Sequence, residues 1–349
     1  MLDLKGIYLN FLSIKRITFK SIRQVFFSTS FYNKLLISEN PNRFFFYPNP
    51  YLLSPLLNQK DLLLKISKFE ANYFWNKSKN INETKNLHSF LWLNLIDRKN
   101  DKETIQKIVI FWIKKYGNYK KDIWNENLLS KRSMAWISNA DIILANKDDN
   151  FQKLFLSSLI KQINFLKKNL AILSHESTKI SCLASIILSG LVFKEYFNNY
   201  NFGLRELKKI IDSFFDKNGF PRNKNSENLI IFLQYFVLIK EWIKGAQEPV
   251  PDYLDEIIEK NLVCLNSFRN ESNQLPLFNG VTEKNLNEFI EYLEKLNYEF
   301  DKKLNCVGDI DIIKNKKNVL YFDCGEPPDH QFSRDYQSGP LSFEYIHEN

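Results

Sequence analysis

The sequence is poor in the residues that make tight turns. It has only 10 glycines and 11 prolines in 349 residues, and an all-β chain with many short strands would use more of both. Apolar residues make up 44% of the chain, which is typical of a globular rather than a disordered protein. The composition therefore favours helices, in one large domain or two smaller ones.

Cysteines and long apolar runs are also scarce. The four cysteines, Cys182, Cys264, Cys306 and Cys324, form no C-x-x-C pair, so their spacing does not indicate a zinc knuckle or a redox site. The longest uncharged apolar stretch, residues 180–193, is too short to cross a bilayer and is typical of a buried helix. We expect free thiols and no cofactor in this chain.

Acidic residues are missing between Leu4 and Ser38. The stretch instead carries basic residues, and apolar residues at roughly helical spacing: Lys5, Lys15, Arg16, Lys20, Arg23, Lys34, Ile7, Phe11, Ile14, Ile22 and Val25. A cleavable signal peptide is not indicated, because Asp3 precedes the apolar run, Asn10 breaks it and no A-x-A site follows. Two hypotheses remain for residues 1–40: a basic amphipathic helix on an anionic membrane surface, or a helix packed on the main domain with a solvated basic face.

The net charge of +8 does not choose a partner by itself. A basic surface can attract nucleic acid, anionic lipid or an acidic polysaccharide. The chain is also rich in Lys, Asn and Ile together, and a biased genome composition would produce the same excess of lysine.

Helical periodicity dominates up to about residue 296. After Asp101, a plausible N-cap, apolar residues follow the i, i+3, i+4, i+7 pattern as far as Gly117, which stands where a C-terminal cap belongs. Similar segments lie at 56–75, 83–97, 126–145, 148–166, 176–197, 202–216, 226–244, 252–268 and 283–296. Short connections predict at least eight helices in antiparallel hairpins around a central cleft, and no fixed repeat period indicates a regular solenoid.

The hydrophobic pattern changes after about residue 300. Residues 308–313 alternate, and residues 319–322 are apolar after a polar turn, which predicts a β-hairpin. Another strand is expected at 341–345. Because so few strands would leave unpaired edges, we expect residues 301–349 to be the beginning of a truncated β-domain.

Several motifs resemble the bacterial heparinase II/III-like polysaccharide lyases. In chain order they are L-H-S-F-L-W-L at 87–93, the set Trp124, Arg132, Trp136 and Ile137, L-P-L-F-N-G at 275–280, and D-C-G-E-P-P at 323–328 followed by S-G-P-L-S-F-E at 338–344. The last pair is the most specific and is similar to the start of the family's β-sandwich. The resemblance extends from about residue 45 to the end of the chain. It rests on the order and spacing of all the motifs rather than on any one of them.

The resemblance implies a mainly α fold. Residues 41–300 would form an α/α toroid of antiparallel helical hairpins, and residues 301–349 the first strands of an antiparallel β-sandwich. It also implies β-elimination on uronic-acid-containing polysaccharides, with an acidic polysaccharide and not a nucleic acid as partner. The implied location is the cell envelope or periplasm, although the cytoplasm and the inner-membrane surface stay open without a clear signal peptide. The resemblance also leaves open whether the rest of the β-sandwich binds a metal.

Elimination on a uronate requires three chemical roles. The enzyme removes the C5 proton beside the carboxylate and expels the C4 oxygen, so one group must neutralise the carboxylate. A base must take the proton and an acid must protonate the leaving oxygen. Asn, Gln, Arg or His suits the first role, and Tyr or His suits the others. The candidate catalytic residues are Asn139, Arg222, Asn223, Tyr336, Gln337 and His330.

Three matched positions depart from the family's pattern. Relatives often have histidine where Asn139 and Gln337 stand, and the segment around Arg222 and Asn223 lacks its histidine. Asparagine can neutralise a carboxylate by hydrogen bonding, but it cannot act as a base.

The lost histidines leave two hypotheses for function. The first is a lyase that is slow or inactive unless Tyr336 or His330 takes over proton transfer. The alternative is a non-catalytic carbohydrate-binding or structural cell-envelope protein of the same fold. A membrane-surface adaptor is a third hypothesis, which rests only on the basic N-terminus.

Aromatic rings and amides complete the candidate substrate site. Flat indole rings suit the apolar faces of pyranose rings, although a tryptophan on a helix more often belongs to a buried core. We expect His88 to pack within its helix. The candidate substrate-binding residues are Trp92, Trp124, Arg132, Trp136 and Asn279.

Overall fold

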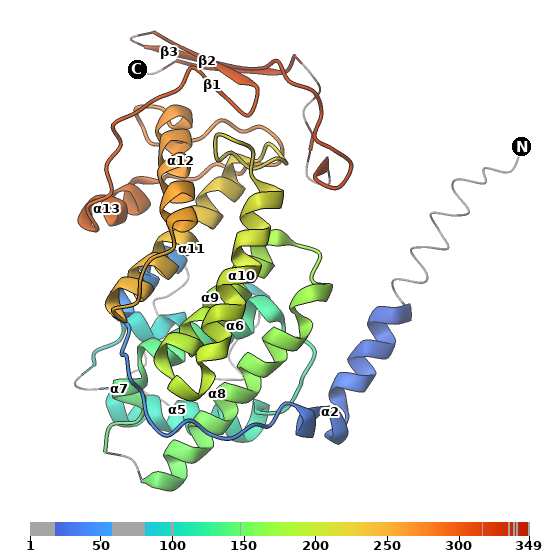
Figure 1. Ribbon diagram of the computed structural model, residues 1–349, viewed down its shortest axis with the longest axis vertical. Helices are drawn as coiled ribbons and strands as arrows, with labels where there is room; N and C mark the ends of the chain where they lie inside the picture. Colours follow the sequence, from blue (N-terminus) through green and yellow to red (C-terminus); the bar gives the residue numbers. More distant parts are fainter. Residues whose placement is uncertain are drawn as a thin grey trace, which may run out of the picture. The chain divides into compact units, whose positions relative to one another are not determined.

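The structure of the chain is a computed structural model (Figure 1). It describes residues 18–57, 81–98, 101–146, 148–315, 317–333, 336–337, 339 and 341–347. The chain divides into two compact units. Unit 1 comprises residues 1–43 and 58–172, and unit 2 comprises residues 44–57 and 173–349.

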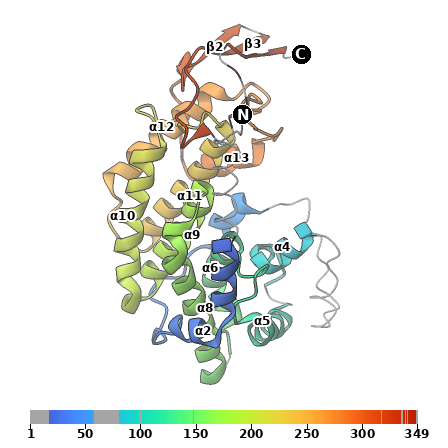
Figure 2. The same ribbon diagram turned by 90° about the vertical axis from the view of Figure 1, so that its right-hand side faces the viewer.

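The described part of unit 1 contains helices and loops (Figures 1 and 2). Residues 18–28 are helical and lead into α2 (Ser30–Leu35). The elements that follow are α4 (Ile81–Ser89), the 3-10 helix η3 (Leu91–Leu95), α5 (Lys102–Tyr116), α6 (Glu126–Ser138), α7 (Ala140–Ile143), α8 (Asp149–Asn169) and the 3-10 helix η4 (Leu170–Ile172).

Helix α5 confirms the predicted helix between Asp101 and Gly117, and its apolar stripe is buried. Two predicted helices of unit 1 are instead interrupted. The segment 83–97 breaks at Phe90, whose φ of 58° is left-handed and whose ring stacks on Trp92 at 5.4 Å. The segment 126–145 breaks at Asn139, which ends α6 and precedes α7. The predicted helix at 56–75 lies mostly outside the described residues, as does the N-terminal segment before residue 18.

Unit 2 contains a group of packed helices and one small sheet. Its helices are the 3-10 helix η1 (Pro50–Leu56), α9 (Glu176–Val192), the 3-10 helix η5 (Lys194–Tyr196), α10 (Phe197–Phe214), α11 (Ser226–Gly245), α12 (Asp252–Phe268) and α13 (Asn287–Lys295). Helix α9 packs against α10 and α11, and α11 packs against α12. Helices α9 and α11 carry buried apolar residues on most of their surface, so they form the centre of this core.

The sheet of unit 2 is antiparallel, with the strand order β1-β2-β3-β4. The strands are β1 (Cys306–Val307), β2 (Ile310–Asn315), β3 (Asn318–Asp323) and β4 (Phe343–His347). One face is buried against the end of α12, where the Tyr321 hydroxyl donates to the Phe268 carbonyl at 2.6 Å. The predicted hairpin and third strand are therefore confirmed, and the last helix, α13, ends at Lys295, before the first strand begins at Cys306.

No helix in the described part of the chain has both the length and the apolar character needed to span a bilayer.

Candidate active site

Three predicted sugar-binding tryptophans lie in the core of unit 1. Trp92, Trp124 and Trp136 are all buried. The Trp136 ring lies 5.4 Å from Phe90 and 5.3 Å from Trp112, both edge-on. Because other aromatic rings cover the indoles, they stabilise the core. Their burial does not support the predicted role of binding sugar at the surface.

Arg132 is also buried, with a side chain that is 0% exposed. Its Nε donates to Gln162 Oε1 at 2.7 Å, and its Nη1 donates to the His88 carbonyl at 2.8 Å. The guanidinium stacks on the Trp112 ring at 4.1 Å, and burial lowers its pKa. Arg132 therefore connects helices of unit 1, which corrects its prediction as a substrate ligand.

His88 packs within unit 1, as expected. Trp112 Nε1 donates to His88 Nδ1 at 2.9 Å. Burial, with the charges of Arg132 and Lys115, lowers the pKa of His88 to about 3. The imidazole is therefore neutral at physiological pH.

Asn139 has its amide group fully engaged inside unit 1. Its Nδ2 donates to Asn94 Oδ1 and to the Ala135 carbonyl, both at 2.9 Å. Its Oδ1 accepts from Arg98 Nη1 at 2.8 Å. The side chain ties the end of α6 to η3, so the structure gives it a role in the fold rather than the predicted role at a substrate carboxylate.

Unit 2 brings four predicted site residues into one cluster. We call it the amide–lysine cluster, and it also contains two residues that the sequence analysis missed, Lys224 and Asp323. Three segments supply it: the loop between α10 and α11, the loop between α12 and α13, and the chain from the end of β3 onward. Its members are Asn223, Lys224, Asn279, Asp323, Tyr336 and Gln337.

The α10–α11 loop is shaped by local hydrogen bonds. Asp216 Oδ1 accepts from the backbone N–H groups of Asn218 and Phe220, at 2.9 and 2.8 Å. Gly219 has a φ of +81°, which suits glycine. At the end of the loop, Asn225 Oδ1 accepts from Asn228 N and caps α11. Asn223 and Lys224 are therefore held between a closed turn and the start of a helix.

Asn279 joins all three segments of the cluster. Its carbonyl accepts from Asn225 Nδ2 at 2.8 Å, and its Nδ2 donates to the Lys224 carbonyl at 3.0 Å. Its Oδ1 accepts from the backbone N–H of Gln337 at 3.4 Å, while the Gln337 side chain is exposed. The residue is buried and has a φ of 55°, a conformation that asparagine tolerates better than most residues. Asn279 therefore organises the cluster as well as forming a turn.

A buried ion pair lies beside these amides. Lys224 Nζ is 3.0 Å from Asp323 Oδ1, and the two side chains are 7% and 1% exposed. The same oxygen accepts from the backbone N–H of Gly325 at 3.1 Å. Asp323 Oδ2 is buried and accepts no hydrogen bond from the described residues. A side chain at Gly325 would collide with the Lys224 amine, so this glycine makes room for the pair.

Besides Asp323 Oδ2, two further polar groups of the cluster have unused hydrogen-bonding capacity. The Tyr336 hydroxyl is buried and has no partner among the residues that the structure describes. Burial and the nearby charge of Asp323 raise its pKa, so the phenol is protonated at neutral pH. Asn223 Oδ1 accepts from Asn225 N at 3.2 Å, whereas Asn223 Nδ2 donates to none of the described residues. An amide donor can hydrogen-bond a carboxylate, and a phenol can take part in a proton transfer.

Arg222 and His330 make no hydrogen bond to the described residues of the amide–lysine cluster. Arg222 is exposed, and its Nε donates to the Phe215 carbonyl at 3.1 Å. His330 is exposed in the loop after β3, where its carbonyl accepts from Ser333. Within the described ranges, the His330 imidazole makes no hydrogen bond or ion pair with the cluster. The structure thus gives no support to His330 as a substitute for the missing strand histidine.

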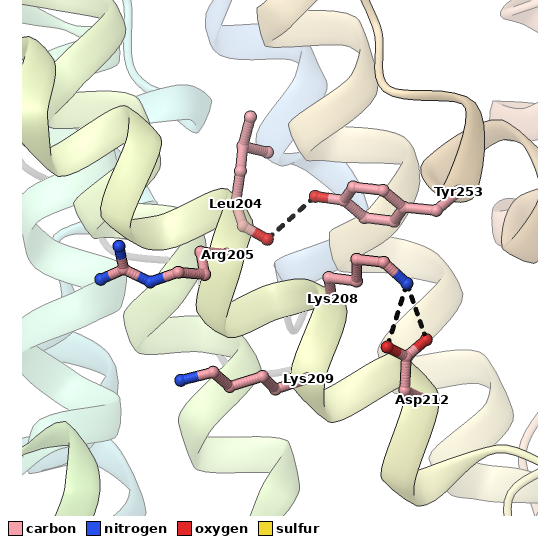
Figure 3. Close-up of a pocket in the computed structure, with 6 residues that line it drawn as sticks. All are labelled: Leu204, Arg205, Lys208, Lys209, Asp212 and Tyr253. Carbon is pink, nitrogen blue, oxygen red and sulfur yellow. Dashed lines mark hydrogen bonds and ion pairs between the residues drawn. The ribbon is translucent and has the colours of Figure 1, made fainter.

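A separate shallow pocket of about 260 Å³ lies on the helices of unit 2 (Figure 3). Lys208 pairs with Asp212 at 3.0 Å, and the Tyr253 hydroxyl donates to the Leu204 carbonyl at 2.9 Å. Arg205 and Lys209, which also line the pocket, pair with Glu206 at 3.6 and 2.8 Å. The pocket contains none of the predicted site residues. In the described part of the chain, no three His, Cys, Asp or Glu side chains gather to hold a metal ion.

Among the comparisons with known proteins, those with solved structures identify the fold. No protein-family model matches the chain, and no curated protein matches it. A crystal structure of heparinase III aligns with a TM-score of 0.61 and 16% identity, over 86% of this chain and 57% of that one. Heparan sulfate lyase HepC from Pedobacter heparinus aligns with a TM-score of 0.58 and 13% identity, over 79% of this chain and 50% of that one. This chain thus spans about half the length of these structures. It has the mainly α fold of the heparinase III-like polysaccharide lyases, an α/α toroid followed by an antiparallel β-structure, as its motifs predicted.

Proposed function

We propose that the amide–lysine cluster binds an acidic polysaccharide and slowly catalyses β-elimination at a uronic acid residue. The fold shared with heparan sulfate lyases supports the choice of reaction. The unpartnered hydroxyl of Tyr336 carries the proposal, because it supplies a proton-transfer group inside the cluster. The class of polysaccharide and the role of each residue are inferred from the chemistry of the cluster.

Asn223 is the proposed neutraliser of the uronate carboxylate. Its Nδ2 is free to donate, and the N-terminus of the 20-residue helix α11 begins three residues later. Unpaired backbone N–H groups and the helix dipole favour negative charge at that end. Both features would stabilise the extra negative charge that develops on the carboxylate when the C5 proton leaves.

Tyr336 is the proposed proton carrier. Its phenolate takes the C5 proton, the C5–H electron pair forms the C4=C5 double bond, and the C4–O bond breaks. The phenol then returns the proton to the departing C4 oxygen. Because burial and Asp323 raise the pKa of Tyr336, only a small fraction is phenolate at neutral pH. The reaction is therefore slow, and its rate rises with pH.

The direct experiment incubates the protein with a panel of uronate polysaccharides and follows the ultraviolet absorbance of the unsaturated product. We expect slow product formation from at least one of them. The rate should rise about tenfold per pH unit below the pKa of Tyr336, because the phenolate fraction rises in that proportion. A pH-independent rate would contradict the role of Tyr336, and the absence of both binding and product would contradict the whole proposal.

A non-catalytic carbohydrate-binding protein is the second candidate function. It is favoured by Gln337, which stands where relatives carry a histidine. Elsewhere in unit 2, His347 contacts Asn318 at 2.8 Å and His330 is exposed, so neither replaces that histidine. Tight binding of a uronate oligosaccharide without product at any pH would establish this alternative. For either function we propose the cell envelope or periplasm, where such polysaccharides occur, as the location.

A further inference from the structure

We infer that residues 18–38 dock unit 1 onto the surface of an anionic lipid bilayer, an activity separate from the proposed lyase site. The observation behind this inference is an outward-facing group of apolar side chains on the first described helix. Phe19, Ile22, Val25 and Phe26 are between 42% and 69% exposed. We call these four residues the apolar arc.

The arc occupies one side of the helix formed by residues 18–28. At about 100° per residue, its four side chains fall within about 120° of the helix circumference. The opposite side faces the protein, where Phe27 is buried and packs edge-on against Tyr119 at 5.3 Å and Phe165 at 5.2 Å. A helix on a water-facing surface normally turns polar residues outward, so this arrangement indicates an apolar environment on the outer side.

The apolar surface continues onto α2. Phe31 and Leu35 lie four residues apart and are both exposed, so they share one face of that helix. Tyr32 is buried between them, and its hydroxyl accepts from Asn169 Nδ2 at 2.9 Å. Asn164 Nδ2, which is also on α8, donates to the Leu36 carbonyl at 2.9 Å. These hydrogen bonds attach the segment that carries Phe31 and Leu35 to α8.

The positive charge of residues 18–38 favours an anionic bilayer as the surface that covers the apolar arc. Lys20 and Lys34 are exposed in the same segment, whereas Arg23 is half-buried and lies over the Phe27 ring at 5.6 Å. No acidic residue occurs between residues 4 and 38. Apolar side chains that enter the headgroup region, flanked only by cations, match an interfacial membrane helix. Each such cation adds attraction to acidic lipids that salt screens. Another protein surface would match the apolar arc but would not require the absence of acidic residues.

The test is co-sedimentation of the full chain with phosphatidylcholine vesicles, with and without phosphatidylserine. We expect binding to the phosphatidylserine vesicles only, and release as salt rises. Phe19→Ser with Val25→Ser, and separately Lys20→Glu with Lys34→Glu, should each weaken binding about tenfold or more. Leu154→Ser is the matched control, because Leu154 is an exposed apolar residue of α8 outside this segment, and it should bind like the wild type.

Three results would overturn the inference. The first is equal binding to neutral and anionic vesicles, and the second is no binding to either. The third is a dimer in solution that Phe19→Ser with Val25→Ser dissociates without changing lipid binding, because the arc would then belong to a second copy of the chain. The Phe19 and Val25 side chains are 65% and 69% exposed, so these substitutions leave the core of unit 1 intact.

Discussion

Replacing Lys224 with methionine is expected to lower the free energy of unfolding by about 3–5 kcal/mol, the usual cost of removing one partner of a buried ion pair. The carboxylate of Asp323 is 1% exposed and would keep only the Gly325 N–H as a partner of its Oδ1. An uncompensated buried charge is costly because neither water nor another cation can reach it. Urea unfolding followed by circular dichroism measures the change.

Two variants control for the loss of a lysine and for the loss of the charge. Lys208→Met removes an exposed pair with Asp212, with side chains 52% and 60% exposed, and should cost only about 0–1 kcal/mol. Adding Asp323→Leu to Lys224→Met removes both charges and should restore much of the stability. Equal losses for Lys224→Met and Lys208→Met would mean that the ion pair does not stabilise the cluster.

Tyr336→Phe is expected to lower the rate of elimination by about 10²–10⁴-fold, the contribution of a positioned acid–base group. The free energy of unfolding should hardly change, because the hydroxyl has no hydrogen-bond partner among the described residues. Affinity for the saccharide should also stay close to that of the wild type. Initial rates of product formation, measured together with an equilibrium dissociation constant, separate these effects.

Tyr345→Phe is the matched control for that experiment. Tyr345 lies on β4, is exposed and contacts Asn318 through its hydroxyl, so its loss should leave the rate unchanged. A wild-type rate in Tyr336→Phe would show that another group carries the proton.

Local signals in the sequence predicted the elements that depend on local physics. Helix α5 follows from its apolar period and from Gly117 at its end, whereas the Asp101 side chain makes no capping hydrogen bond. The hairpin of β2 and β3 follows from alternation and a polar turn. The break at Phe90 has no such signal, because a left-handed phenylalanine is held by its stacking on Trp92. That contact exists only in the folded core.

The site was harder to predict because its contacts join distant parts of the chain. Lys224 and Asp323 are 99 residues apart, and nothing near Lys224 marks it as buried. A usable signal was present at Asp323, which shares a strand face with Val319 and Tyr321, both buried. A carboxylate on a buried face requires a cationic partner. The opposite case is Arg132, where a motif suggested a substrate ligand but the buried guanidinium donates to Gln162 and to the His88 carbonyl.

The most direct measurement of the central claim, that Asn223 holds the substrate's carboxylate, uses Asn223→Asp. This variant keeps the oxygen that accepts from Asn225 N and replaces the free amide donor with a negative charge. Calorimetric titration should compare a uronate oligosaccharide with its carboxyl-reduced form, in the wild type and in the variant. We predict that the wild type prefers the uronate, and that Asn223→Asp loses that preference while it still binds the reduced form. An unchanged preference for the uronate in Asn223→Asp would contradict the proposed site.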